Sequence, residues 1–380
     1  MISRRTLLAT QAAGISFSLA GGWVRPVRAQ GGGPLAPWNV AAHADPRLAA
    51  LAWGVLAPNP HNRQPWLMRL VGTDSILLHV DLDRRLPVTD PLDRQILIGL
   101  GCFTELLRLA AAQQGIAAEI APFPEGEPQP RLDARPIARI TFRGSATPDP
   151  LFAVAGQRRS AKQPYDVTRE VAAPQIAALR AALLATQGFG AETGDVARLR
   201  DIAWRAWEIE ANDRAAWMET VRLMRFGSAA VAAQPDGVSL WGPQMDPLVA
   251  AGQLTPAAME PGQEGWRIGA AQYRAIFEGT NAFTWLVTPG NGRVAQFAAG
   301  RDWLRLNLAA TAQGLALQPV SQGLQEFPAM AGPYRELHAL LGQTGTSHGG
   351  TVQMLGRIGH PLRAAPPTPR WPMESRILAG

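Results

Sequence analysis

The chain has 380 residues, of which 47% are hydrophobic, and a formal net charge of +6. This length and composition allow two ordinary domains or one large one with a buried core, and they exclude a disordered or fibrous protein. The single cysteine, Cys102, excludes a disulfide framework and any multi-cysteine metal or iron–sulfur site. The six histidines form no metal-binding pattern, so we expect no metal site.

The first 29 residues have the pattern of a twin-arginine export signal. Arg4 and Arg5 precede a mildly apolar run that ends near Trp23, and Val27-Arg28-Ala29 is a small-x-small cleavage pattern. The alternative is a short membrane anchor, but the run contains several glycine and polar residues and is too short to span stably. We therefore expect export through the twin-arginine translocase to the periplasm, in the folded state, with no stable membrane span.

The positive charge belongs largely to this leader. Residues 1–29 contain four arginines and no acidic residue, so their removal lowers the net charge from +6 to +2. The basic balance is therefore no indication of nucleic-acid binding. Among 36 Lys and Arg residues, Lys162 is the only lysine. It stands out against that background, although codon bias alone could produce a single lysine.

The mature chain begins with a glycine-rich linker and a first set of elements. Punctuation by Gly, Pro and Asp and the apolar periodicity indicate their bounds. We expect a helix over 45–56, a strand pair over 65–71 and 75–81, a long helix over 90–115, a strand over 137–143 after a proline-rich stretch, and a domain joint at 147–150.

A second set of elements follows the joint. We expect a helix around residue 151, helices over 174–187 and 196–226, a Gly- and Pro-rich region over 227–265, a strand over 282–288, a helix over 298–313, strands over 317–321 and 351–358, and a proline-rich tail over 361–372.

Two segments of the two sets resemble each other. Residues 101–115 and 300–314 are Ala- and Leu-rich, and they align with glycine at both ends. Any two amphipathic helices that end in glycine would align in this way. The strand before the second copy and the similar half lengths favour a duplicated domain. We therefore expect a monomeric pseudo-dimer with halves 30–147 and 148–380.

One candidate binding motif opens the second half. Arg158-Arg159-Ser160-Ala161-Lys162 places two guanidinium groups, a hydroxyl and an ammonium within five residues. Arginine offers a planar fork to a phosphate, serine a neutral donor and lysine a point charge. If the stretch is extended, residues 158, 160 and 162 point to one side. The alternative is a solvated basic loop.

The other candidate motif lies in the first half, between the first helix and the first strand. It reads Pro58-Asn59-Pro60-His61-Asn62-Arg63-Gln64-Pro65-Trp66. The prolines restrict the backbone, and the amide side chains can recognise heteroatoms of a planar ring. The alternative is an ordinary loop in which His61 is a hydrogen-bonded loop residue.

Together the two motifs resemble those of the nitroreductase-like FMN-binding family. Members carry an Arg-x-Ser-x-Lys/Arg motif followed by a Pro-Ser-x-x-Asn-x-Gln-Pro-Trp motif, whereas here the order is reversed. Family members are homodimers whose FMN is held by the first motif of one subunit and the second motif of the other. A fused pair needs one copy of each, and neither motif has a clear second copy in this chain.

The resemblance covers residues 45–378. With the tail at 366–372 and the export signal, it looks like a tandem-fused, twin-arginine-exported subgroup similar to the dormancy-associated nitroreductase-like proteins of actinobacteria. It implies an α+β fold of two degenerate halves, with antiparallel sheets flanked by helices. Residues 227–265 match the position of a mobile cover over the flavin, with Trp241 or Trp266 near the ring. The alternative is a surface excursion.

The resemblance also implies which residues would bind FMN. The matching positions are Arg158, Arg159, Ser160 and Arg370 for the phosphate and ribityl chain, Pro58, Asn59, Pro60 and Asn62 for the ring-facing loop, Lys162 for the N1 and C2 carbonyl side of the ring, Asn212 on a helix, and Pro319, Val320 and Ser321 in the segment whose backbone amide approaches N5.

Three functions remain open at this point. The first is an FMN-dependent oxidoreductase that transfers a hydride to nitroaromatic or quinone-like acceptors, with NAD(P)H as a possible donor and no catalytic side chain, since flavin N5 carries the chemistry. The second is a non-catalytic protein that stores or sequesters FMN. The third is a flavin-free interaction protein in which the grip is vestigial.

Overall fold

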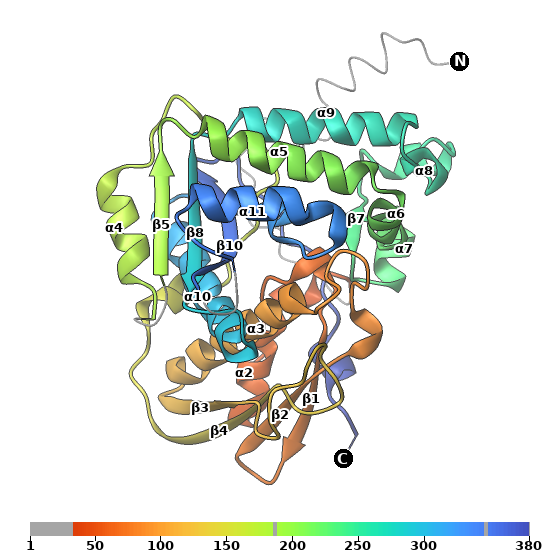
Figure 1. Ribbon diagram of the computed structural model, residues 1–380. Coiled ribbons are helices and arrows are strands. Elements are labelled where there is room, and N and C mark those ends of the chain that lie inside the picture. Colours follow the sequence, from red (N-terminus) through yellow and green to blue (C-terminus); the bar gives the residue numbers. More distant parts are fainter. Residues whose placement is uncertain (1–32, 185–187, 346–348, 380) are drawn as a thin grey trace.

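The protein is built around two long helices, α3 (Arg94–Gln113) and α10 (Arg293–Ala312), that pack against each other in the middle of the molecule (Figure 1). The computed structural model describes residues 33–184, 188–345 and 349–379. The predicted export signal lies outside the described residues. The expected α+β class, with antiparallel sheets flanked by helices, is confirmed.

The first half consists of one sheet and two main helices. Its elements are η1 (Ala36–Trp38), α2 (Pro46–Gly54), η2 (Pro60–Asn62), β1 (Trp66–Val71), β2 (Ser75–Val80), η3 (Leu82–Arg84), α3, β3 (Ile116–Pro122) and β4 (Ala138–Ser145). Asp45 caps α2 by accepting from the amide of Arg47, and Pro46 fits the first helical position.

The second half repeats this plan and adds helices. Its elements are η4 (Pro150–Val154), α4 (Ala173–Ala181), β5 (Gly188–Thr193), α5 (Ala197–Asn212), α6 (Arg214–Arg222), β6 (Met224–Phe226), α7 (Ser228–Ala233), β7 (Val238–Leu240), α8 (Asp246–Ala250), η5 (Ala257–Met259), α9 (Glu264–Glu278), β8 (Ala282–Thr288), α10, β9 (Ala316–Pro319), η6 (Gln322–Leu324), η7 (Pro328–Met330), α11 (Ala331–Leu340), β10 (Thr351–Gly359) and η8 (Met373–Arg376).

The two main sheets have the same topology. Their strand orders are β1-β2-β4-β3 and β5-β8-β10-β9. In each sheet the strand that comes third along the chain, β3 or β9, lies at the edge beside the strand that comes fourth. In each half a long helix, α3 or α10, connects the second strand to the third. The expected internal repeat is therefore present in the structure as two halves of matching connectivity.

Glycine allows the two central helices to approach closely. A Cβ atom on Gly101 would lie 2.2 Å from the carbonyl oxygen of Phe297, and one on Gly300 would lie 2.0 Å from that of Ile98. Cys102 donates its thiol to the Gly300 carbonyl across the same contact. These glycines are the aligned starts of the two similar segments, so the internal repeat places its two copies face to face.

Several predicted elements differ from the structure. The expected helix over 196–226 is two helices, because Asp213 breaks it and caps α6 through the amides of Ala215 and Ala216. The expected helix over 174–187 ends at Ala181. The sequence patterns do not predict β3, β5, β6, α9 or α11, nor the short elements α7, β7 and α8 inside the Gly- and Pro-rich region.

The core runs continuously between the halves. Both α3 and α10 are mostly buried, and they join the two sheets into one hydrophobic cluster. Among the described residues α3 is the one helix long and apolar enough to cross a membrane, but 94% of its apolar window is buried inside the protein. It is therefore accounted for as a core helix. The C-terminal tail crosses back to the first half, where Ile377 bridges Met68 of β1 (Figure 1).

Candidate anion site and its counterpart

Three arginines meet just beyond the C-terminal end of α2. Arg158 donates from Nη2 to the carbonyl of Leu56 at 3.1 Å, and Arg370 donates to the carbonyls of Val55, Leu56 and Ala57 at 3.0–3.3 Å. Arg159 donates from Nη1 to the carbonyls of Gly156 and Arg158. We call Arg158, Arg159 and Arg370 the arginine cluster. It joins the first predicted motif to the predicted tail residue, from opposite ends of the second half.

The arginine cluster has no acidic partner. Within the described residues none of its three guanidinium groups forms an ion pair with a carboxylate, although Arg158 and Arg370 are only 3% and 2% exposed. Burial, together with the charge of Arg159, lowers the pKa of Arg158 to about 10. Burial and the two neighbouring arginines also lower the pKa of Arg370. Buried charges normally have a counter-charge, so this cluster has the electrostatics of an anion site.

The donors differ in how much binding capacity they retain. Each of the three nitrogens of Arg370 already donates to the protein, including Nη1 to the side chain of Asn62 at 2.6 Å. Arg370 therefore contributes charge rather than an open donor. By contrast, Nε of Arg158 is buried and has no partner among the described residues. An orphaned guanidinium donor inside a positive cluster fits an anion such as a phosphate.

The loop of the second motif lies against the arginine cluster. His61, Asn62 and Gln64 have φ angles of 48°, 52° and 51°, in the left-handed region that L-residues rarely adopt. The surrounding bonds hold this conformation, because Asn62 donates to the Pro369 carbonyl at 3.0 Å and receives a bond from Arg370. Backbone strain of this kind is concentrated at functional sites.

The structure places the predicted loop residues with different roles. Asn62 contacts the arginine cluster directly, and half-buried Pro58 directly follows the helix-end carbonyls that the cluster contacts. Asn59 instead fixes the loop itself, because its side chain accepts from the Gln64 amide and donates to the Ala57 carbonyl. Asn59 and Pro60 rest on Gly99 of α3, where a Cβ would lie 3.1 Å from each.

Residues 235–237 of the predicted cover pack on this loop. Gly237 donates its amide to the Asn62 carbonyl at 3.1 Å, and Gln64 donates to the Pro235 carbonyl at 2.7 Å. Asp236 binds Arg63 at 2.8 Å in a buried ion pair. Trp266 packs on α5 and donates to the Ala211 carbonyl.

Two titratable side chains from different segments, His61 and Glu210, lie within electrostatic range of Lys162. Lys162 is exposed, and its charge acts both on His61 of the loop and on Glu210 of α5. Burial, together with Lys162, lowers the pKa of His61 to about 4, so His61 is neutral near pH 7. His61 Nε2 lies 3.0 Å from the Thr220 hydroxyl. The charge of Lys162 is therefore felt at the second motif, and its position at the flavin ring stays a prediction.

Glu210 is the buried acid of this group. It is 5% exposed, and its Oε2 accepts from Nε2 of Gln325 at 2.9 Å. Burial raises the pKa of Glu210 to about 7, although Gln325, Gln322 and Lys162 act in the opposite direction. Near neutral pH, Glu210 is therefore protonated in a large share of the molecules.

The remaining predicted residues are divided. Ser160 is half-buried between Arg159 and Lys162. Ser321 follows β9 and donates to the Gln95 side chain, but the Val320 amide is already donated to Leu355 at 2.9 Å. Pro319 has no amide hydrogen. Any amide that this segment offers to a ligand must therefore come from Ser321 or a later residue.

Asn212 does not join the group. It is exposed, and its amide donates to the Glu208 carbonyl of the same helix at 2.8 Å. Two residues along a helix correspond to a rotation of about 200°, so Asn212 points away from buried Glu210. The helix position that faces the group is Glu210, which the sequence analysis had missed.

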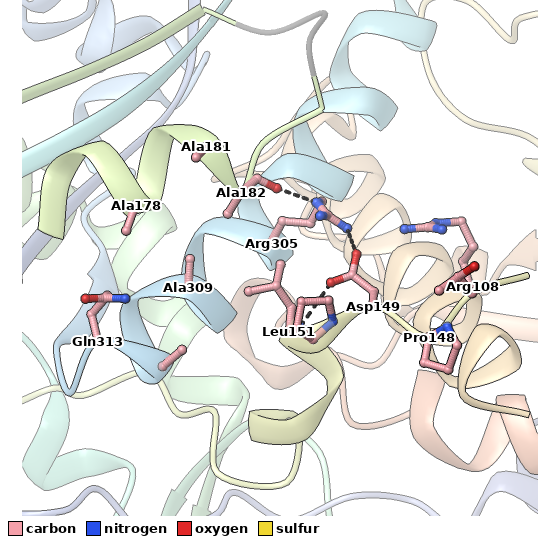
Figure 2. A pocket seen from close by; sticks show the side chains of 13 residues that line it. Arg108, Pro148, Asp149, Leu151, Ala178, Ala181, Ala182, Arg305, Ala309 and Gln313 are labelled. Carbon is pink, nitrogen blue, oxygen red and sulfur yellow. Dashed lines mark hydrogen bonds and ion pairs between the residues drawn. The ribbon is translucent and has the colours of Figure 1, made fainter. Parts of the chain in front are cut away.

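We call the cavity of about 590 Å³ at the end of α4 the counterpart cavity, because α4 leads into the second sheet as α2 leads into the first (Figure 2). Ala182 follows α4 as Leu56 follows α2, and its carbonyl accepts from Nε of Arg305 at 2.5 Å. Asp149 follows β4 as Arg370 follows β10, and it pairs with Arg305 at 2.8 Å. At this end the arginine therefore has an acidic partner.

A second carboxylate completes the pairing at the counterpart cavity. Glu105 of α3 is fully buried and pairs with Arg108, Arg301 and Arg305 at 2.6–3.0 Å. These arginines hold the pKa of Glu105 below its usual range despite its burial. Glu105 is ionised. Glu105 and Asp149 neutralise the arginines at this cavity, whereas the arginine cluster has no equivalent carboxylate among the described residues.

The sequence is similar to nitroreductases. No family model matches it. Two Mycobacterium tuberculosis proteins named "Putative NAD(P)H nitroreductase" are similar to it: one is 27% identical over 359 residues, covering 90% of this chain and 96% of that protein, and the other, acg, is 39% identical over 69 residues, covering 18% and 20%.

Solved structures of nitroreductases are also similar to this chain. The nitroreductase-like family protein from Bacillus cereus has a TM-score of 0.33 and 14% identity, covering 62% of this chain and 98% of its own. The FMN-dependent nitroreductase NfnB from Mycobacterium smegmatis, solved with NADPH, has a TM-score of 0.31 and 19% identity, covering 57% and 92%. By sequence, the chain is thus similar over nearly its whole length to a protein named as an NAD(P)H nitroreductase.

Proposed function

We propose that the chain binds one FMN, with the phosphate at the arginine cluster, and acts as an NAD(P)H-dependent oxidoreductase of the nitroreductase type. The observation that carries the proposal is the buried guanidinium set without a carboxylate, beside a strained loop from the other half. The name of the full-length relative supports the nitroreductase activity and the NAD(P)H donor, and the two motifs support FMN. Since the halves supply one copy of each motif, a single chain completes the site.

The residues of the site would have different roles. Arg158 and Arg159 would hold the phosphate, Arg370 would add charge, and Asn62 would fix the loop against them. Lys162 and Glu210 lie on the side of the site where the loop places His61. Bound FMN would supply two-electron transfer to a nitroaromatic or quinone-like acceptor. The protein's contribution is to bind and orient the cofactor and to set the local charge.

An absorbance spectrum of the natively purified protein tests the cofactor. Flavin bands that remain with the protein after gel filtration would support FMN, and release of FMN rather than FAD on denaturation would identify it. A colourless protein that also fails to bind added FMN would refute the proposal. That result would leave the flavin-free interaction protein as the remaining function.

Storage of FMN is the alternative function, and one observation favours it. Residues 235–237 bind the backbone and side chains of the loop, so the cover is fastened to the site. Anaerobic mixing with NADPH separates the alternatives, because bleaching of the flavin requires a turnover-competent site. Persistent colour would support storage.

We also propose that the cover, residues 227–265, is a lid over the flavin. Asp236 fastens it through ion pairs with Arg63, Arg84 and Arg225. Asp236→Asn should therefore increase iodide quenching of bound FMN by loosening the cover. Unchanged quenching would contradict a lid and leave this region a surface excursion.

The charge of Lys162 is proposed to set the flavin potential rather than the affinity. A positive charge near the ring stabilises the anionic reduced form more than the oxidised form. Lys162→Met should lower the midpoint potential of bound FMN while changing its dissociation constant little. An unchanged potential would return Lys162 to the phosphate end or to no role.

We also propose export by the twin-arginine route, on the pattern of residues 1–29. Fractionation of cells expressing the full chain should place the protein in the periplasm. Replacing Arg4 and Arg5 by lysine should retain it in the cytoplasm. A periplasmic double variant would contradict this route.

A further inference from the structure

An aromatic side chain from outside both motifs covers the arginine cluster. Trp38 lies at the end of η1, ahead of the first main helix. The guanidinium carbon of Arg159 is 4.2 Å from the centre of its ring, and that of Arg370 is 5.6 Å away. One ring therefore contacts two of the three charges of the cluster.

The segment that carries Trp38 is fastened to the C-terminal tail. Trp38 Nε1 donates to the Thr368 carbonyl at 2.8 Å, and the Arg370 amide donates to the Pro34 carbonyl at 2.9 Å. The Thr368 hydroxyl in turn accepts from Arg370 Nη1 at 2.5 Å. Residues 34–38 thus form a strap over the cluster. Both ends of this strap are hydrogen-bonded to tail residues 368–370.

The indole ring of Trp38 carries no charge, and this decides how it acts on the neighbouring arginines. Guanidinium groups repel one another, and the negative face of an indole offsets part of that repulsion. A carboxylate would offset more, but it would also occupy the position of an incoming anion, as Asp149 does beside Arg305. An aromatic face stabilises both cations and leaves the edge of Arg159 able to donate to a phosphate.

We propose that Trp38 is a positioning residue of the anion site: its ring holds Arg159 and Arg370 in place around the phosphate of the cofactor and thereby slows the release of that phosphate. The identity of the ligand rests on the proposed function. The positioning role concerns the arginine cluster itself. Trp38 therefore acts on the binding of the phosphate rather than on any redox step.

Stopped-flow measurement of FMN release, followed by the recovery of flavin fluorescence, tests the proposal. Trp38→Leu keeps an apolar side chain but removes the π face, and it should raise the dissociation rate about ten-fold. Trp38→Phe keeps a ring without the Nε1 donor, and it should restore most of the slow release. Fluorinated tryptophan at position 38 keeps the shape of the ring and weakens its π face, so a role in packing alone predicts no change of the release rate with it.

Riboflavin is the matched control ligand, because it lacks the phosphate. Its release should be equally fast in the wild type and in both variants. Phe189→Ala is the control variant, since Phe189 lies under Arg180 at 5.0 Å on another face, and it should leave FMN release unchanged. If Trp38→Leu does not fold, site-specific fluorinated tryptophan at position 38 weakens the π face at constant shape and should still accelerate release.

The outcomes separate the two proposals. Failure of the wild type to bind FMN refutes the proposed function. If FMN binds and Trp38→Leu or the fluorinated protein releases it at the wild-type rate, Trp38 has no positioning role. Equal acceleration of riboflavin and FMN would also overturn the inference, because the ring would then act on the flavin instead of the phosphate.

Discussion

The two ends of the pseudo-dimer share one framework and differ in charge balance. At one end Arg158, Arg159 and Arg370 meet without a carboxylate, whereas at the other Arg305 is paired with Asp149 and Glu105. In each case an arginine donates to a carbonyl just beyond a helix that leads into an edge strand of a sheet. The framework alone therefore does not make an anion site.

The difference teaches how a duplicated fold can keep one site and close the other. In a buried ion pair the carboxylate already neutralises the arginine, so an anionic ligand would have to displace that carboxylate. Unbalanced guanidinium groups gain their counter-charge only when an anion binds. On the proposed function, the acidic residues at 105 and 149 would reserve anion binding for the opposite end.

The largest expected effect comes from breaking the unpaired end. Arg158→Met removes the buried guanidinium but keeps much of its length. Losing one partner of a buried charge pair should weaken FMN binding by about 4 kcal/mol, roughly a thousand-fold. Fluorescence titration of the apoprotein measures the dissociation constant. A change below about three-fold would show that the cluster does not bind the phosphate.

Arg305→Met is the matched control at the paired end. It should leave FMN affinity unchanged but lower the free energy of unfolding, because Asp149 and Glu105 lose a partner. Arg158→Met should instead leave the unfolding free energy of the apoprotein nearly unchanged, since removing its charge also relieves repulsion within the arginine cluster. Urea denaturation of both variants without ligand tests this opposite behaviour. Similar losses of stability in both would contradict the comparison.

The second prediction uses Glu210, whose burial raises its pKa to about 7 from the ordinary value of 4.5. The protonated form is favoured in the folded state, so the contribution of Glu210 to stability is full below pH 4.5 and falls as the pH rises to about 7. Over that range the loss is about 3 kcal/mol.

Glu210→Gln should remove this pH dependence while keeping an oxygen for Gln325. The measurement is the difference in unfolding free energy between wild type and variant at several pH values from 4 to 8. We expect the variant to gain relative to wild type as the pH rises. A constant difference would show that Glu210 titrates normally. The fully buried Glu105, held ionised by three arginines, should show no such loss near neutral pH.

The sequence predicted the elements with clear periodicity. The bounds of β8 match, and α3 and α10 lie within a few residues of the expected ranges. It missed β5 because glycines interrupt that strand, yet the structure needs one of them: a Cβ on Gly190 would lie 2.1 Å from the Trp285 ring of the neighbouring strand. The residue that hides the strand locally is required by its tertiary neighbour.

The candidate site was predictable where the motif is local and hidden where it depends on distant contacts. The sequence indicated the arginine cluster, including Arg370, through a resemblance between motifs. Trp38 gave no signal, because its contact with Thr368 spans 330 residues. The family resemblance points to Asn212, whereas the buried residue of the same helix is Glu210, which the motif comparison does not single out.

The smallest expected effect sharpens the comparison from the paired end. Asp149→Asn removes one carboxylate beside Arg305 and keeps the side-chain oxygen that accepts from the Leu151 amide at 3.0 Å. Because Glu105 still neutralises part of the charge, we expect only a weak new anion site, with a dissociation constant on the order of millimolar, about −4 kcal/mol. Equilibrium dialysis with labelled inorganic phosphate, in the presence of saturating FMN, measures it. Asp133→Asn is the matched control, since Asp133 likewise accepts from an amide two residues later and pairs with an arginine, but on the surface. It should bind no additional phosphate. If Asp149→Asn also binds none, the carboxylate is not what closes the second end, and the shape of the cavity around Arg305 must exclude the anion instead.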